Sequence, residues 1–419
     1  MGVASRREEP PSVTKSVSKK PSTAEEDDWM KNPLPLEFEY IKSVQQDSAA
    51  SASLSPTRFI WEDPSQIPRR DWLYGWHLMR GILSLTVAPG GVGKSSLMVV
   101  QALELASGKE LLGHRVSGQR RVWLINLEDD RNELRRRVSA AIKHHGLNPV
   151  DIGDRLYVDS GLEQELLLAS ERRDDLFLNE EVFQRLEEEI RREKIDVVII
   201  DPFVSAHQVN EADNGKIDRI AKRLARLALH TNCALELVHH TRKLNGMDVT
   251  SEASRGASSL LAATRSSRTI QKISEKERRE WGVVDDRGTY FFIQRDKANL
   301  AHAGSRETYR TVSLDLGQGD EIAVVERFEP PDAFDGISVD DLLRVQRAID
   351  GKQCRFSDQA DDWVGNTVAK VLGLDARKEQ ARIKKMIRAW INARALVKTR
   401  VKINSRDTPI VEVGELAGE

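Results

Sequence analysis

The sequence predicts an α/β fold with a parallel sheet, followed by a smaller α+β domain near the C-terminal end. Between residues 82 and 239, fully apolar strands alternate with helical patterns, as is typical of parallel sheets that are buried on both faces. The first of these strands runs into a glycine-rich loop and an apolar helix start. After Pro330-Pro331 the pattern changes to three helices and a two-stranded ribbon, which favours a winged-helix domain.

We assign each element of the main domain from its apolar pattern. Short continuous apolar runs predict strands, and longer runs with a helical period predict helices. Strands are expected at 82–87, 121–127, 156–159, 197–200 and 234–239, and the last of them is expected to end the parallel series. Helices are expected at 94–107, 130–146, 180–193 and 214–231. Three further strands, at 269–273, 290–294 and 311–316, are expected to extend the sheet as a meander. In the C-terminal domain we expect helices at 339–349, 363–372 and 378–393 and strands at 397–403 and 409–413.

Composition divides the 419 residues into four segments. Residues 1–56 are rich in Ser, Lys, Glu and Pro with few apolar clusters, which predicts a disordered tail. The main domain is expected at 57–330, a linker at 331–336 and the winged-helix domain at 337–419. Several large rings lie between residues 67 and 76, and the sequence leaves open whether they pack in the core or line a base pocket.

The bulk properties exclude several classes of protein. The formal net charge is −2, so any surface for nucleic acid must be a local one. The two cysteines, Cys233 and Cys354, indicate a reducing compartment with no role for either thiol in the chemistry. No apolar run approaches the roughly 20 residues of a membrane span. The N-terminal segment has no apolar core of a secretory signal. We therefore expect a cytoplasmic protein with no membrane partner.

The glycine-rich loop matches a phosphate-binding pattern. Ala88-x-x-x-x-Gly93-Lys94-Ser95 fits G-x-x-x-x-G-K-[ST], with alanine at the first position. Backbone N–H groups of such a loop and of the following helix start face an anion. We expect Lys94 to reach the β- and γ-phosphates and Ser95 to supply a hydroxyl to Mg²⁺. The predicted ligands are therefore ATP and Mg²⁺, and the residues expected to cradle the nucleotide are Pro89, Gly90, Gly91, Val92, Gly93, Lys94, Ser95 and Ser96.

Carboxylates end two of the neighbouring strands. Asp201 follows the apolar run 197–200, where it is placed to hold the Mg²⁺ shell beside Ser95. The strand before it ends in Glu128-Asp129-Asp130. We expect Glu128 to polarise the attacking water, with Asp129 as the alternative and Asp130 as a helix cap.

Histidines and arginines complete the candidate set. The pair His239-His240 ends the fifth strand and suits a sensor of the γ-phosphate better than a metal site, because no third ligand is spaced nearby. Two arginines, Arg255 and Arg265, flank an apolar helix. Each has the fixed charge that an arginine finger on a neighbouring subunit needs, and a solvated surface position is the alternative for each of them. Lys297 lies in another cationic pair after a later strand and is the remaining alternative.

With these residues laid out, the chain resembles the RecA-like ATPases of the plasmid RepA replicative-helicase type. The resemblance covers about residues 72–310, with the motifs in the same order throughout. It rests on Gly90–Ser95, Leu127-Glu-Asp129, Asp201, His239-His240 with Lys243, Ala253-Ser-Arg-Gly256, Glu280-Trp-Gly-Val283 and Lys297-Ala-Asn299.

The resemblance implies a RecA-like core in a homohexameric ring that moves on single-stranded DNA. It implies a catalytic role for Glu128, metal binding by Asp201, sensing by His240 and an arginine finger at Arg265. Ala88 departs from the usual first glycine, and the tail and the C-terminal domain are additions to the minimal helicase. Because of these additions, two other functions stay open. One is an ATP-switched DNA-binding or recruitment protein that does not unwind, and the other is a signalling ATPase of the KaiC-like kind.

The C-terminal domain carries a strong local charge asymmetry. Between residues 377 and 406 the only acid is Glu379. A helix and a ribbon with such an excess of cations suit a phosphate backbone, so we expect this domain to bind duplex DNA. The cations are Arg377, Lys378, Arg382, Lys384, Lys385, Arg388, Arg394, Lys398, Arg400, Lys402 and Arg406.

Overall fold

The structure is a computed structural model that describes residues 55–241, 257–281, 283, 288–298, 306–317, 319–403 and 405–417. The chain divides into two compact units, residues 1–68 and 69–419. In the described part of the first unit, residues 55–68 are exposed and contain no helix or strand. Most of the predicted tail lies outside the described residues. No helix among the described residues has the length and apolar character needed to cross a bilayer.

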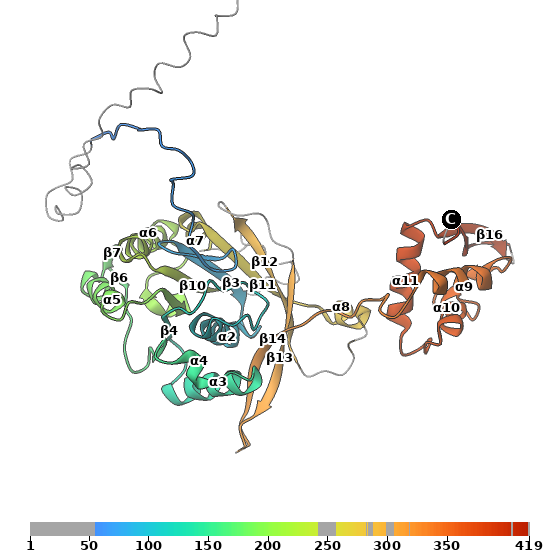
Figure 1. The fold of residues 1–419 in the computed structure, drawn as a ribbon, viewed down its shortest axis with the longest axis horizontal. Helices are drawn as coiled ribbons and strands as arrows, with labels where there is room; N and C mark the ends of the chain where they lie inside the picture. The colour runs from blue at the N-terminus through green and yellow to red at the C-terminus, as the bar shows by residue number, and fades with distance from the viewer. Residues whose placement is uncertain are drawn as a thin grey trace, which may run out of the picture. The chain divides into compact units, whose positions relative to one another are not determined.

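A nine-stranded mixed sheet organises the main domain (Figure 1). The six strands from β11 to β5 are parallel, and β12, β13 and β14 continue the sheet in antiparallel fashion. The strand order is β14 (Glu321–Arg327), β13 (Glu307–Asp315), β12 (Tyr290–Ala298), β11 (Ser266–Lys272), β3 (Leu83–Pro89), β10 (Ala234–Thr241), β8 (Val197–Asp201), β4 (Val122–Asn126) and β5 (Leu156–Ser160).

Two features of this sheet differ from the prediction. The strand β10 does not end the parallel series, because β11 also pairs in parallel with β3. The helix α7 (Ala257–Ala263) packs on α6 and β3 before β11 begins. The chain therefore returns to the end of the sheet where the parallel strands begin, and β11 runs along β3 in the same direction. The strand β14 was not predicted, although its alternating burial is that of an ordinary sheet strand.

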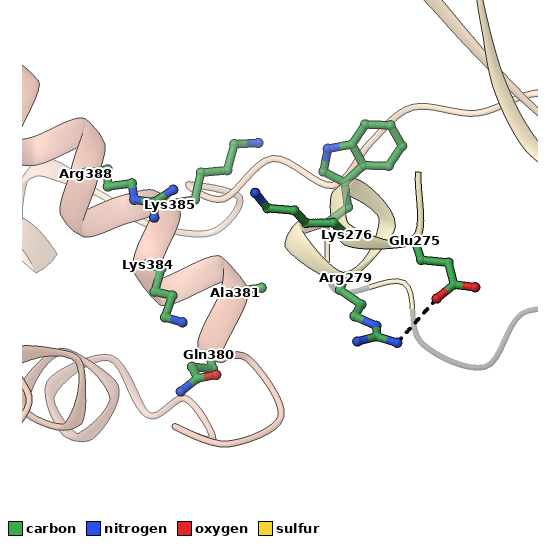
Figure 2. A pocket seen from close by; sticks show the side chains of 9 residues that line it. Glu275, Lys276, Arg279, Gln380, Ala381, Lys384, Lys385 and Arg388 are labelled. Carbon is green, nitrogen blue, oxygen red and sulfur yellow. Dashed lines mark hydrogen bonds and ion pairs between the residues drawn. The ribbon is translucent and has the colours of Figure 1, made fainter. Parts of the chain in front are cut away.

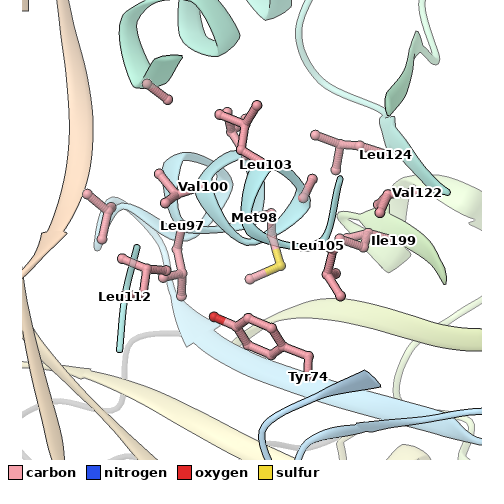
Figure 3. Packing of buried hydrophobic residues seen from close by; sticks show 14 of the residues in the cluster. Tyr74, Leu97, Met98, Val100, Leu103, Leu105, Leu112, Val122, Leu124 and Ile199 are labelled. Carbon is pink, nitrogen blue, oxygen red and sulfur yellow. The ribbon is translucent and has the colours of Figure 1, made fainter. Parts of the chain in front are cut away.

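Helices cover both faces of the parallel strands (Figure 1). On one face α2 (Lys94–Ser107) and α3 (Arg131–His144) share an apolar core with the sheet, part of which Figure 3 shows. On the other face α5 (Glu180–Arg192), α6 (Asn214–Thr231) and α7 form a second core. The bounds of α2 and α6 are those that the sequence predicts, because their apolar faces and their caps coincide. A glycine follows α2 in the left-handed region, and the Asp213 carboxylate caps α6.

Smaller elements lie at the margins of the main domain. The remaining elements are β1 (Trp72–Tyr74), β2 (Leu78–Met79), α4 (Pro149–Ile152), β6 (Ala169–Arg172), β7 (Asp175–Leu178), the 3-10 turn η1 (Phe203–Ala206), β9 (His207–Gln208) and α8 (Glu275–Glu280). The ring of Tyr74 is buried beneath α2 (Figure 3). Trp76, in contrast, is exposed. For Tyr74 the core alternative is therefore the correct one.

The C-terminal segment has an apolar core of its own, drawn from residues 333–413. The three predicted helices and the ribbon are present, and β15 adds a short third strand to the ribbon. The domain boundaries and the winged-helix assignment stay predictions. The elements are α9 (Val339–Ile349), β15 (Cys354–Arg355), α10 (Val364–Leu372), α11 (Gln380–Asn392), β16 (Leu396–Ile403) and β17 (Arg406–Val413).

Buried histidines make the folded state sensitive to acid. Burial lowers the pKa of His77, His207 and His239 to about 4 and that of His114 to about 3. Below the ordinary histidine value of about 6.5, the unfolded chain takes up one proton at each of these four histidines, and the folded chain does not. Burial also raises the pKa of Glu104 to about 7, so this group binds a proton in the folded state and offsets one of the four.

We therefore expect the free energy of unfolding to fall by about 4 kcal/mol per pH unit between roughly pH 6 and pH 5. Urea unfolding followed by circular dichroism at several pH values measures this slope. The variant His207→Phe keeps a ring but cannot titrate, so its slope should be smaller by about 1.4 kcal/mol per pH unit. A free energy of unfolding that stays constant over this range would contradict the prediction.

Candidate active site

The glycine-rich loop joins the carboxyl end of β3 to the start of α2. Gly91 and Gly93 have φ of 72° and 98°, in the left-handed region where glycine is favoured, whereas Gly90 does not need this freedom. A Cβ at Gly93 would lie 3.0 Å from the Thr311 methyl group, so packing also favours glycine there. Gly93 is the N-cap of α2, and no side chain caps this helix. The first N–H groups of α2 are thus available to an anion.

Lys94 and Asp201 meet at the bottom of this loop. The Lys94 Nζ donates to Asp201 Oδ1 at 2.7 Å, and both side chains are almost fully buried. The second carboxylate oxygen, Asp201 Oδ2, is buried with no hydrogen-bond partner among the described residues. Ser95 adds a hydroxyl 3.4 Å from Lys94 Nζ. Mg²⁺ prefers oxygen ligands. The unpartnered Asp201 Oδ2 and the Ser95 hydroxyl, which both lie near Lys94, are ligands of this kind.

Glu128 lies on the turn after β4 and faces the same point. Its Oε2 is 3.8 Å from Lys94 Nζ, and its Oε1 is 3.6 Å from His240 Nε2. The side chain is 49% exposed, so a water molecule has access to its carboxylate. Asn126 holds the turn, because its Oδ1 accepts hydrogen bonds from the backbone N–H groups of Glu128 and Asp129 at 3.0 and 2.8 Å.

The two acids after Glu128 have other partners. Asp129 forms an ion pair with Arg137 at 3.1 Å, and burial raises its pKa. Asp130 caps α3 by accepting hydrogen bonds from the backbone N–H groups of Glu133 and Asn132. Both hydrogen bonds lower the pKa of Asp130, and the one from Glu133 has the larger effect. The cap is the one that the sequence predicts. Of the three acids, Glu128 is the one that contacts both Lys94 and His240.

The period of β10 separates the two histidines. Successive side chains of a strand point to opposite faces of the sheet. His240 lies near Glu128, and burial together with the nearby Lys94 charge lowers its pKa. His239 is buried on the other face, where its Nδ1 lies 3.7 Å from a Glu211 carboxylate oxygen. Of the two candidates, only His240 shares the site with Glu128.

Arg265 lies at the opposite edge of the sheet. Its backbone N–H donates to the Leu83 carbonyl at 3.3 Å, at the start of β3, while the loop begins at the other end of this strand. Six residues of strand span about 20 Å. Lys297 pairs with Ser267 and so belongs to the same edge as Arg265, but its side chain and the whole of Arg255 lie outside the described residues. The structure does not bring the exposed Arg265 to the loop of its own chain.

Sequence reasoning missed a buried polar cluster beneath the loop. Glu236 on β10 and Arg268 on β11 are fully buried and form an ion pair at 2.9 Å. A charged residue in the middle of an apolar strand, as in Leu235-Glu-Leu-Val238, was the signal for it.

The role of Asn126 was also missed, since an asparagine at a strand end has no pattern of its own.

One comparison with known proteins bears on this site. The model of a family described as AAA domain matches residues 48–246. The matched range contains the loop with Lys94 and Ser95, the turn with Glu128, the end of β8 at Asp201 and the end of β10 at His240. It stops before α7, Arg265, the antiparallel strands and the C-terminal segment. The match supports a P-loop ATPase-type domain in this part of the chain, with nucleotide binding and ATP hydrolysis as its chemistry.

Proposed function

We propose that this chain is an ATP-dependent DNA helicase or translocase of replication, in which an AAA-type ATPase domain hydrolyses ATP at the subunit interfaces of a homohexameric ring. The observation that carries the proposal is the separation of the charged groups. Lys94, Asp201, Glu128 and His240 gather at one edge of the sheet, while Arg265 is exposed at the other edge. Such an arrangement is complete only when a second copy supplies its arginine.

Hydrolysis follows from the groups at the loop. The N–H groups of the loop and the Lys94 ammonium bind the phosphates, and Lys94 exchanges its contact with Asp201 for the γ-phosphate. Ser95 and Asp201 would hold Mg²⁺, which would neutralise charge on the phosphate oxygens. Glu128 orients a water molecule and accepts its proton as the water attacks the γ-phosphate. His240 lies within reach of Glu128 and of this phosphate, and so reports the loss of the γ-phosphate to the end of β10.

The proposal for DNA rests on the cations of α11 and β16. Lys385, Arg388, Arg400 and Lys402 are exposed and make no ion pair within the described part of the chain. Lys398, Arg400 and Lys402 alternate along β16 and therefore share one face of the ribbon. We propose that these groups bind the phosphates of duplex DNA and that the segment is a winged helix.

Three of the eleven cations are engaged within the described part of the chain and are weaker candidates. The Lys398 ammonium lies 4.0 Å from the centroid of the Phe356 ring. Arg382 donates to the Ala333 and Asp335 carbonyls, and Lys384 forms an ion pair with Asp358. Figure 2 shows Lys384 beside Lys385 and Arg388 on α11. Lys384 therefore provides a matched control for its free neighbours.

In the full chain, replacing Lys385, Arg400 and Lys402 together by Gln should weaken duplex binding to a similar degree on unrelated sequences. The slope of log K against log salt, which is negative, should become shallower by about 3, roughly one for each cation that no longer neutralises a phosphate. Fluorescence anisotropy across a salt series measures both quantities. The control Lys384→Gln should change the slope by well under one. If the single variants Lys384→Gln and Lys385→Gln changed the slope equally, this result would contradict the proposed surface.

The function as a whole is tested by measuring the ATPase rate with and without single-stranded DNA, together with the mass of the assembly. Stimulation by DNA in a hexamer-sized assembly supports the proposal, and its absence favours a signalling ATPase. A strand-displacement assay then separates the helicase from the alternative, an ATP-switched recruitment protein that hydrolyses ATP without unwinding.

A further inference from the structure

A buried ion pair crosses the strand that carries the phosphate loop. Arg268 Nη2 on β11 lies 2.9 Å from Glu236 Oε1 on β10, and β3 lies between these two strands. Thr86 of β3 joins the pair, since its hydroxyl accepts from Arg268 Nε at 2.8 Å and donates to Glu236. His77 Nε2 lies 3.0 Å from the same carboxylate. Each of the four side chains is almost completely buried.

Gln101 connects this pair to α2. Its amide nitrogen donates to Glu236 Oε2, and its amide oxygen accepts from Arg268 Nη2. Gln101 lies seven residues after Lys94, which is two turns along the same face of the helix. The pair is thus attached to the helix whose first residue is the phosphate-binding lysine.

Stability alone does not explain an ion pair at this place. Replacing a buried ion pair by apolar residues of similar volume is often neutral or stabilising, because two charges must leave water. The surroundings offer such an alternative, since Leu97, Met98 and Leu105, which lie on the same side of α2 as Gln101, are buried in the apolar core (Figure 3). Apolar contacts are non-directional, whereas hydrogen bonds to a carboxylate select one placement of the helix along the sheet.

The same pair is attached to the strand that carries His240. In the register of β10 with β3, Glu236 lies opposite Ser84 and His240 opposite Ala88, so both side chains point to the face that α2 covers. Four residues of strand separate the carboxylate from the imidazole, and the strand is fully paired on the side of β3. A shift of α2 against Glu236 therefore changes the distance between Lys94 and His240.

We infer that Gln101, Glu236 and Arg268 are positioning residues, which set the place of Lys94 at the start of α2 relative to His240 at the end of β10. The inference rests on the proposed hydrolysis of ATP at this site. Nucleotide binding depends mainly on the loop and Lys94, whereas hydrolysis also needs Glu128 and His240 in register with them. Loss of the connection should therefore lower turnover more than affinity.

The first test is the full-length variant Gln101→Met, which keeps the volume of the side chain and removes both hydrogen bonds. We expect kcat to fall at least tenfold, while KM and the dissociation constant of a non-hydrolysable ATP analogue change less than threefold. The matched control is Tyr74→Phe, which removes a different buried hydrogen bond to α2, that of Tyr74 to Glu104 at 2.5 Å. It should lower the melting temperature and leave kcat within twofold of the native value.

The second test exchanges the two groups. The single variants Gln101→Glu and Glu236→Gln disturb the charge of the cluster, whereas the double variant restores one carboxylate and one amide around Arg268. Because Arg268 Nη2 contacts both side chains, the double variant should regain at least half of the native kcat. Failure of the exchange to restore kcat in a folded double variant, or a fall in kcat for Tyr74→Phe equal to that for Gln101→Met, would overturn the inference.

Hydrogen exchange separates this inference from the proposed function. The ATP analogue should protect the amides of residues 88–97 and 235–241 in the native protein, and only those of residues 88–97 in Gln101→Met. Absence of protection at residues 88–97 in the native protein contradicts nucleotide binding itself. Equal protection of residues 235–241 in the native protein and in Gln101→Met contradicts the positioning role alone.

Discussion

Replacing Arg265 by Ala should lower the ATPase rate of the assembled protein by about 10³–10⁵, the range found for arginine fingers. The side chain is exposed, and its backbone lies at the start of β3, about 20 Å along the strand from the phosphate loop of its own chain. In the proposed assembly, its charge would therefore stabilise the transition state only on a neighbouring subunit. Steady-state ATPase assays at saturating ATP measure the loss, and nucleotide affinity of the isolated subunit should not change.

Mixed assemblies test the trans arrangement directly. Arg265→Ala subunits have an intact loop and Lys94→Ala subunits have an intact finger, so an interface that combines them is complete. We expect partial recovery of activity when the two inactive variants exchange subunits. No recovery in fully exchanged mixtures would contradict a finger at Arg265 and favour Arg255 or Lys297.

The Glu128→Gln variant should bind ATP with nearly native affinity and lose about 10²–10⁴ in turnover, the usual contribution of a general base. The amide keeps the size of the side chain but cannot accept the proton of the attacking water. Lys94→Ala and Asp201→Ala should abolish hydrolysis, and they should also weaken the binding of Mg²⁺-ATP, because they remove phosphate and metal contacts. Nucleotide titration together with single-turnover kinetics separates the two effects.

Asp129→Asn provides the comparison for Glu128→Gln. Asp129 is paired with Arg137 and does not contact Lys94, so its replacement should reduce turnover only a few-fold. Near-normal turnover in Glu128→Gln, with a large loss in Asp129→Asn, would transfer the role of the base to Asp129.

Local sequence was sufficient for the elements with their own periodicity and caps. The bounds of α2, α6 and α9 agree with the prediction to the residue, because apolar faces and capping residues coincide at their ends. The loop before Lys94 was recognisable for a similar reason, since glycines at fixed spacing between a strand and a helix have few other uses. The strand β14 and the parallel pairing of β11 were missed, because the partners of a strand are distant in the sequence.

The sequence was sufficient to identify most of the candidate site residues, because each of them begins or ends an element that its own apolar pattern predicts. They are Lys94, Ser95, Asp201, the three acids from Glu128 to Asp130 and the two histidines at the end of β10. The sequence left the choice within the acids and the histidines open. The folded chain separates them, since Asp129 is engaged by Arg137, Asp130 caps α3, and the alternation of β10 turns His239 away from Glu128. The buried pair of Glu236 and Arg268 depends on the same tertiary information. Its two members are 32 residues apart, and strand order and register alone bring them together.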